Sequence, residues 1–344
     1  MSLTARETDV LITIVEEYIA NAAPVGSRTV AKRSGLQLSP ASMRNTMADL
    51  TDKGFLNQPH TSAGRVPTAL AFRLYVDNRL HLAPLSATMR SGISRNLLSS
   101  GLELSDVLSQ AARMVSDFSR GLSIILAPSR ADVRWKSIDF SLIKPRLVLA
   151  VLILEGGIVQ NKLLEVDEDI SAGDLVAFGN YLNDHFAGLT LAQARSRILG
   201  ELLGAESRLQ EMYRKALRLA RHAFDNLEDR DLYVEGQVNI LEYAEFADIH
   251  RMRDILRLVE ERSRLLDILD RTILAEEGTK ITLGQETDEQ GLSEYGVVSS
   301  TYGRDSHTPG IVGVIGPLRM DYAKIVPVVD YIANALTNLL KQRF

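Results

Sequence analysis

Three helical segments and a hairpin follow one another in the first 80 residues, and this order narrows the possible folds more than any other feature. Apolar residues at helical spacing predict a helix over residues 4–21, and a second is expected over residues 28–34. Ser39 as an N-cap and Pro40 in the first turn begin a third helix that runs to about Asp52. Three helices with tight connectors and a hairpin predict a winged helix-turn-helix.

Local signals mark the ends and the buried sides of these helices. Thr4 and Glu7 have the spacing of a capping box, and Gly54 is the expected stop of the third helix. The third helix should bury a stripe with spacing i, i+4, i+7, which consists of Met43, Met47 and Leu50.

The hairpin carries a polar loop, NQPHTSAGRVPT, at residues 57–68. Short strands are expected over residues 55–58 and at Arg65-Val66, where Pro67 ends the second. We interpret the loop as the wing. Gly64 would let its tip approach a duplex closely, and Arg65 would supply a positive charge.

The exposed side of the third helix has residue types that bind DNA. A helix N-terminus offers free backbone N–H groups to phosphate, and Arg and Asn side chains pair with guanine and adenine edges. The expected base contacts are Ser42, Arg44, Asn45 and Arg65. The expected phosphate contacts are Arg28, Lys32, Ser39 and Thr61, together with Arg33. The alternative is a protein-interaction module, in which these arginines are ordinary surface charges.

Charge is unevenly distributed along the chain. Residues 1–80 contain nine Lys or Arg and seven Asp or Glu, a net charge of +2, whereas the remaining residues have a net charge of −7. This asymmetry is typical of a basic binding module attached to an acidic body.

Composition excludes several other classes of protein. The chain has no cysteine, so disulfides and thiolate chemistry are excluded and a reducing cytoplasm is the expected compartment. The longest strongly apolar run, Leu147–Leu154, is far shorter than the roughly 20 residues that cross a bilayer. The N-terminus, MSLTARETDVL, has acidic residues where a signal peptide needs an apolar segment.

The rest of the chain predicts a mixed α and β protein of two or three domains. A boundary is expected near Ala83-Pro84, and a tight turn at Glu155-Gly156-Gly157. Helices are expected over residues 68–80, 102–120, 171–226, 247–275 and 322–340. Strands are expected over residues 136–142, 147–154, 158–166, 280–283, 295–302 and 310–315.

Signals of catalysis are poor. The six histidines have no metal spacing, and the glycines of residues 310–316 do not have the spacing of a dinucleotide fingerprint. The acidic residues Asp167, Glu168, Asp169 and Asp174 lack the alternation and closing Glu of a calcium loop. We therefore expect no enzyme, no cofactor and no metal.

Three blocks of the sequence resemble one family. Residues 24–68, PVGSRTVAKRSGLQLSPASMRNTMADLTDKGFLNQPHTSAGRVPT, closely resemble the N-terminal region of the HrcA family of bacterial heat-inducible transcription repressors. LYVEGQVNIL (232–241) and GVIGPLRMDYAKIVPVVDYIANAL (313–336) are similar to its C-terminal blocks. The chain departs from the family pattern at Gly284-Gln285-Glu286-Thr287 and at Tyr295-Gly296.

The resemblance implies an α+β multidomain protein. Its parts would be a winged helix over residues 1–80, a GAF-like α/β domain over 81–166 and 235–344, and an inserted dimerising domain over 167–234. It also implies a homodimer that binds an inverted-repeat operator upstream of chaperone operons, kept active by a GroEL-type chaperonin. The alternative is a small-molecule-responsive winged-helix regulator whose GAF-like domain binds a ligand.

Overall fold

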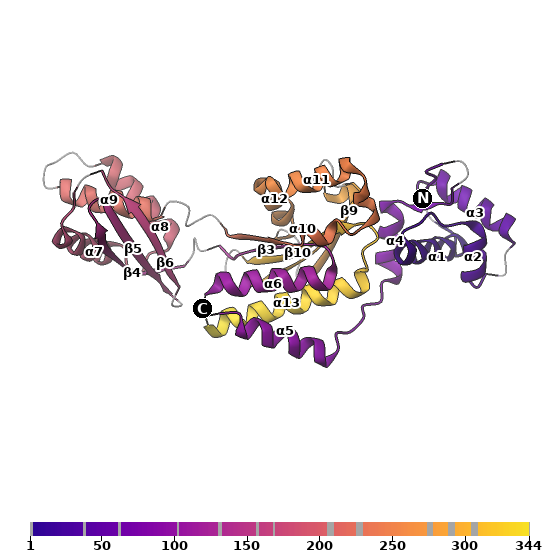
Figure 1. Cartoon of the computed structure of the whole chain (residues 1–344), viewed down its shortest axis with the longest axis horizontal. Coiled ribbons are helices and arrows are strands. Elements are labelled where there is room, and N and C mark those ends of the chain that lie inside the picture. The colour runs from indigo at the N-terminus through magenta and orange to yellow at the C-terminus, as the bar shows by residue number, and fades with distance from the viewer. Residues whose placement is uncertain are drawn as a thin grey trace. The chain divides into compact units, whose positions relative to one another are not determined.

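The computed structural model describes most of the chain in twelve ranges: residues 3–36, 39–60, 63–101, 103–129, 133–155, 158–167, 169–204, 210–224, 230–273, 278–287, 293–303 and 309–343. The chain divides into two compact units (Figure 1). Unit 1 comprises Met1–Leu126, Leu232–Tyr302 and Ile311–Leu336. Unit 2 comprises Ala127–Asp231, Gly303–Gly310 and Thr337–Phe344.

The N-terminal part of unit 1 is a small group of helices and strands, residues 5–67, which we call the head. It consists of α1 (Ala5–Asn21), α2 (Ser27–Arg33), α3 (Pro40–Asp52), β1 (Leu56–Asn57) and β2 (Val66–Pro67). The two strands are antiparallel, with Leu56 opposite Pro67. The elements have the predicted order, and Gln37 and Leu38, between α2 and α3, lie outside the described residues.

The predicted helix ends and buried stripe of the head are confirmed. Thr4 and Glu7 form both hydrogen bonds of the capping box. Ser39 caps α3, and Gly54 has the positive φ of a helix stop, at 81°. The core residues contributed by α1 and α3 are Val10, Leu11, Ile12, Ile14, Val15, Met43, Met47 and Leu50.

The part of unit 1 that follows α4 (Ala69–Arg79), which we call the body, is built on a five-stranded sheet. The strands are β3 (Leu122–Leu126), β7 (Leu232–Glu235), β8 (Thr279–Leu283), β9 (Tyr295–Tyr302) and β10 (Gly310–Pro317), in the order β7-β3-β10-β9-β8. β3 pairs antiparallel with both β7 and β10, and β8 pairs antiparallel with β9. The sequence did not predict β7, which is short and half-buried.

Helices cover both faces of this sheet. On one side lie α11 (Ile249–Glu260) and α12 (Arg262–Ile273), and on the other α5 (Ala87–Ser99), α6 (Leu104–Ser119) and α13 (Tyr322–Arg343) (Figure 1). Two short turns, α10 (Gln237–Ile240) and η2 (Ala244–Ala247), precede α11, and η3 (Gly284–Thr287) follows β8. The helix α4 (Ala69–Arg79) connects the head to the body.

Apolar side chains fill the sheet face that lies toward α11 and α12. Leu122, Ile124 and Ile315 from the strands are buried with Ile255 and Leu265 from the helices. A Cβ added at Gly313 would lie 3.2 Å from Cδ2 of Leu269. This filled packing counts against a ligand site on that face, which the alternative function would need.

Unit 2 packs a three-stranded antiparallel sheet against helices. The strands are β4 (Trp135–Lys144), β5 (Leu147–Leu154) and β6 (Val159–Glu165), and the helices are α7 (Ala172–Phe186), α8 (Leu191–Gly204) and α9 (Gln210–Phe224). All three strands lie within two residues of their predicted bounds. The predicted turn at Gly156 and Gly157 lies outside the described residues.

The strands of unit 2 belong with its helices, whereas the prediction placed them in the GAF-like domain and began the inserted segment at residue 167. Asn183 of α7 accepts hydrogen bonds from Trp135 Nε1 (3.2 Å) and Ile138 N–H (2.7 Å). The Trp135 ring stacks on Phe186 with centroids 5.7 Å apart. These contacts join β4 to α7, so the second unit begins at Ala127.

No helix among the described residues is long and apolar enough to cross a membrane.

Candidate nucleic-acid interface

The third helix of the head presents its polar side to solvent because its apolar side is buried. Met43, Met47 and Leu50 face the core, and Arg44 and Asn45 are exposed. Ser39 Oγ accepts a hydrogen bond from the Ser42 N–H at 3.1 Å, which begins the helix. Ser39 Oγ also donates to Ser42 Oγ at 3.1 Å, so the Ser42 hydroxyl keeps its own proton for another acceptor.

Two contacts fix α3 on the start of α1. Lys53 Nζ lies 2.6 Å from Glu7 Oε1, and Arg6 donates to Thr46 Oγ1 at 3.1 Å. The hydrogen bond from Lys53 and the Thr4 N–H lower the pKa of Glu7 to about 2. Glu7 therefore stays ionised and tied to both helices over the whole physiological range.

The base of the β1–β2 loop is held on the segment that precedes α2. Val25 and Arg65 exchange two backbone hydrogen bonds, of 2.8 and 2.9 Å. A Cβ on Gly64 would lie 2.5 Å from the Val25 carbonyl oxygen, which no real side chain allows. Gly64 is thus needed for packing inside the head, a reason that differs from the predicted approach to a duplex.

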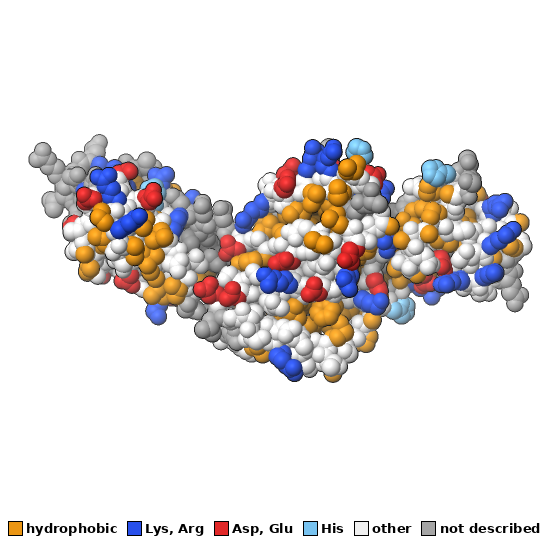
Figure 2. All heavy atoms as spheres, in the orientation of Figure 1, with side chains coloured by type: hydrophobic (Ala, Val, Ile, Leu, Met, Phe, Trp, Pro, Cys, Tyr) orange, Lys and Arg blue, Asp and Glu red, His pale blue; other side chains and the backbone are white. Residues whose placement is uncertain are grey.

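Three of the predicted arginines line one cleft of about 500 Å³: Arg28 of α2, Arg44 of α3 and Arg65 of the loop. Figure 2 shows Lys and Arg side chains over α2 and α3. The other residues that line the cleft are Val25, Gly26, Ser27, Met47, Gln58, Ala63 and Gly64. Residues far apart in sequence thus place three guanidinium groups around one opening, a suitable arrangement for an anionic backbone.

The cationic side chains around this cleft differ in their partners. Within the described part of the chain, no ion pair engages Arg28, Lys32, Arg44 or Arg65. Arg33, in contrast, lies 2.9 Å from Glu17 of α1. The Arg65 Nε is buried and has no hydrogen-bond partner among the described residues. Arg33 is therefore the least suited of the predicted phosphate contacts, and Arg65 has a donor that remains unsatisfied.

The remaining predicted residues lie around the same region. Lys32 and Ser39 are exposed, and Ser42 is half-buried beside the helix cap. Thr61 lies outside the described residues.

Sequence reasoning missed Gln58, which lines the cleft and donates a hydrogen bond to the Ala63 carbonyl at 3.3 Å. Its position next to the first strand of the hairpin was the available signal, because that position places an amide at the root of the loop.

Comparison with known proteins gives a consistent picture over the whole chain. Residues 105–326 match the C-terminal domain of HrcA proteins. A protein of Nitratidesulfovibrio vulgaris (strain Miyazaki F) named "Heat-inducible transcription repressor HrcA" is 54% identical, with 100% of this chain and 97% of that protein aligned. A protein of the same name from Geobacter sulfurreducens is 40% identical, with 98% of each chain aligned.

One solved structure is similar over nearly its full length. A crystal structure described as that of a hypothetical protein, at 2.2 Å resolution, has a TM-score of 0.62 and 22% sequence identity. The alignment covers 99% of each chain. This likeness concerns the fold alone.

Proposed function

Because the chain belongs to the HrcA family of heat-inducible transcription repressors, we propose that its head is a winged helix-turn-helix that binds an inverted-repeat operator of heat-shock (chaperone) operons. The family consists of repressors and not of enzymes, and the chain needs no cofactor for this role. Since its partner would be double-stranded operator DNA, the proposed location is the cytoplasm.

The convergence of Arg28, Arg44 and Arg65 on one cleft is the observation that carries this proposal. The N-terminal half of α3 would enter the major groove, where Ser42, Arg44 and Asn45 reach base edges. Arg65 would contact the duplex from the wing. Arg28, Lys32, Ser39 and Thr61 would hold phosphates, which positions the head without reading sequence.

A salt titration of binding tests this function. The purified protein is mixed with a chaperone-operon inverted repeat and with a scrambled duplex of equal length, at several salt concentrations. We expect binding to the repeat to be about a thousandfold or more tighter, with affinity falling steeply as salt rises. Equal and weak binding to both duplexes would contradict the proposal.

An inverted repeat calls for two heads, and we place the proposed homodimer contact on the outer face of the sheet of unit 2. All eight residues of β5 are apolar, but only alternate ones, Val148, Ala150, Leu152 and Leu154, face the helices. The outward ones are Leu147, Leu149, Val151 and Ile153, all half-buried. Val159 and Leu163 of β6 lie opposite Ile153 and Leu149 on the same face.

Polar residues surround this apolar stripe. On the outer face, β4 contributes Ser137, Asp139, Ser141 and Lys144, each paired in register with an outward residue of β5. On β6, Asn161 lies between Val159 and Leu163, and Glu165 follows Leu163 on the same face. An apolar centre with a polar margin is the usual composition of a protein–protein interface, and a two-fold axis brings the same patch of two copies together.

A GroEL-type chaperonin is the proposed partner that keeps the repressor active. Stabilities of globular proteins are only about 5–15 kcal/mol, so moderate heat can deplete the folded dimer. We expect purified protein that has been heated and cooled to lose operator binding, and to regain it when chaperonin and ATP are present during cooling. Full recovery of binding without chaperonin would contradict this part of the proposal.

A further inference from the structure

Helix α4 is bound tightly to the head. Arg79 of α4 lies 3.3 Å from Asp9 of α1. The ring of Phe72 packs edge-on against Tyr18 with centroids 6.4 Å apart, and Phe72 is fully buried. Because α4 is fixed at two points along its length, it has the orientation of the head.

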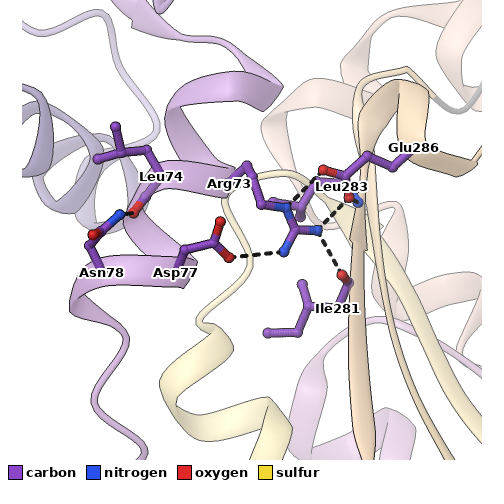
Figure 3. A network of polar contacts seen from close by, with 7 residues as sticks. All are labelled: Arg73, Leu74, Asp77, Asn78, Ile281, Leu283 and Glu286. Atoms are coloured by element: carbon purple, nitrogen blue, oxygen red, sulfur yellow. Dashed lines mark hydrogen bonds and ion pairs between the residues drawn. The ribbon is translucent and has the colours of Figure 1, made fainter. Parts of the chain in front are cut away.

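An arginine of the same helix makes polar contacts with the body. Arg73 Nε donates to Glu286 Oε1 at 2.8 Å, and Arg73 Nη2 donates to the Ile281 carbonyl at 2.7 Å (Figure 3). Nη2 also donates to Glu286 Oε2, which makes the pair bidentate. Asp77, one turn further along α4, lies 3.4 Å from Nη1. All three guanidinium nitrogens are therefore engaged in a fixed geometry.

The body holds its side of this contact in place. The Leu283 N–H donates to Glu286 Oε2 at 2.9 Å, so the carboxylate is oriented by the end of β8. Burial by itself raises the pKa of Glu286, but the hydrogen bonds from Arg73 and Leu283 outweigh it, and the net pKa is lowered. The pair is therefore fully charged at neutral pH.

The start of α4 also lies directly on the turn that carries Glu286. Gly284 has a φ of +54°, and a Cβ there would lie only 2.6 Å from the Ala69 Cβ. The turn is η3, so the start of α4 and Arg73 both meet the same short segment after β8.

We propose that Arg73 is a positioning residue that sets which spacing between operator half-sites this repressor accepts. The inference rests on the proposed function, since two heads must reach two half-sites at a separation fixed by the protein. Arg73 does not line the cleft of Arg28, Arg44 and Arg65, and its guanidinium is engaged by Glu286, the Ile281 carbonyl and Asp77. It acts by fixing α4, and with it the head, on the body.

A charge swap tests this inference. The variants are Arg73→Glu, Glu286→Arg and the double variant, and Arg95→Glu is the matched control because Arg95 is an exposed arginine of α5 that makes no ion pair in the described part of the chain. Each is titrated with a single half-site duplex and with inverted repeats whose spacer changes in steps of one base pair. Affinity for the half-site duplex reports whether a single head is folded and binds DNA, independently of the spacing between two heads.

We expect Arg73→Glu to bind the repeat of natural spacing about tenfold more weakly, the size of an ordinary coupling between two sites, and to bind the half-site as the wild type does. The spacing preference should flatten. The double variant should recover the preference, because it restores an ion pair with the charges exchanged. The recovery should be partial, because the Ile281 carbonyl then lacks its donor. Arg95→Glu should keep the wild-type preference.

Two results would overturn the inference. One is an unchanged spacing preference in Arg73→Glu, and the other is an equal loss of half-site and repeat binding, which would place the effect in the head itself. A wild-type protein that binds the repeat no better than scrambled DNA would instead overturn the proposed function, so the two failures are distinguishable.

Discussion

Arg44 and Arg28 line the same cleft, but they are expected to have different effects on sequence recognition. Arg44 is exposed on the outer side of α3, so Arg44→Ala should cost about 1–3 kcal/mol of binding and relax specificity at one base pair. The measurement is the affinity for a set of operators that each have one base pair replaced. A uniform loss across the set would show that Arg44 holds a phosphate instead.

Arg28→Ala is the complementary variant. Arg28 lies on α2 and not on α3, the proposed recognition helix, and it should contact phosphate only. Its loss should weaken all sequences alike and reduce the slope of log affinity against log salt by about 1. If Arg28→Ala changed the preference among operator variants, the assignment of base and phosphate contacts would be reversed.

Gly64 has a packing role that can be measured without DNA. A methyl group there would collide with the Val25 carbonyl, which is part of a backbone bridge and cannot rotate away. We expect Gly64→Ala to lower the free energy of unfolding by about 1–3 kcal/mol in urea titrations. Gly92→Ala in α5 is the control, since an added Cβ there meets nothing within 4 Å, and it should be neutral or stabilising.

At the scale of the elements, the ion pair between Glu7 of α1 and Lys53 at the end of α3 makes the free energy of unfolding depend on pH. The pKa of Glu7 falls from 4.5 to about 2 on folding, so its ionised form stabilises the native state above pH 4.5. That contribution is lost as the pH falls from 4.5 to about 2. We expect the stability difference between the wild type and Glu7→Gln to be constant above pH 5 and to vanish near pH 2.

Urea unfolding midpoints at pH 7, 4.5, 3 and 2 measure this difference. Glu16→Gln is the control, because Glu16 is an exposed carboxylate of the same helix. A difference between wild type and Glu7→Gln that persists at pH 2 would mean that the side chain acts through packing and not through its charge.

The helices and strands of the chain could be predicted largely from local patterns, but the long-range side-chain contacts between them could not. The capping box at Thr4 and the Ser39-Pro40 start of α3 depend on neighbours three residues away, so the sequence displays them directly. The contact of Arg73 with Glu286 spans 213 residues, and that of Glu7 with Lys53 spans 46. The periodicity of apolar residues in the sequence does not predict such distant pairs.

Long-range contacts also explain two features that the sequence did not predict: the shared cleft of the three arginines and the packing of the unit 2 strands on α7. Arg28, Arg44 and Arg65 could be selected by residue type, but their common cleft depends on the backbone bridge between Val25 and Arg65. The strands of unit 2 could be predicted from alternation, yet their association with α7 depends on Asn183, an unremarkable amide in the sequence.

At the scale of the whole molecule, the dimer proposal predicts that a charged side chain on the outer face of the unit 2 sheet disrupts self-association. Leu163 on the outer face of unit 2 is 60% exposed, and Val176 on α7 is 61% exposed, so the two are matched in accessibility but lie on different elements. Leu163→Lys should weaken self-association, whereas Val176→Lys should leave it unchanged. Sedimentation velocity over a range of protein concentrations measures the monomer–dimer equilibrium.

Symmetry sets the size of the effect. In a two-fold dimer each substitution occurs twice in one interface, and burying a Leu side chain is worth about 1.5–3 kcal/mol, so Leu163→Lys should weaken association by about a hundredfold or more. Half-site binding should be unchanged, because the proposed contact includes no residue of the head, while binding to the full repeat should fall toward that of a single head. Equal dimerisation of the Leu163→Lys and Val176→Lys variants would place the contact elsewhere on the chain.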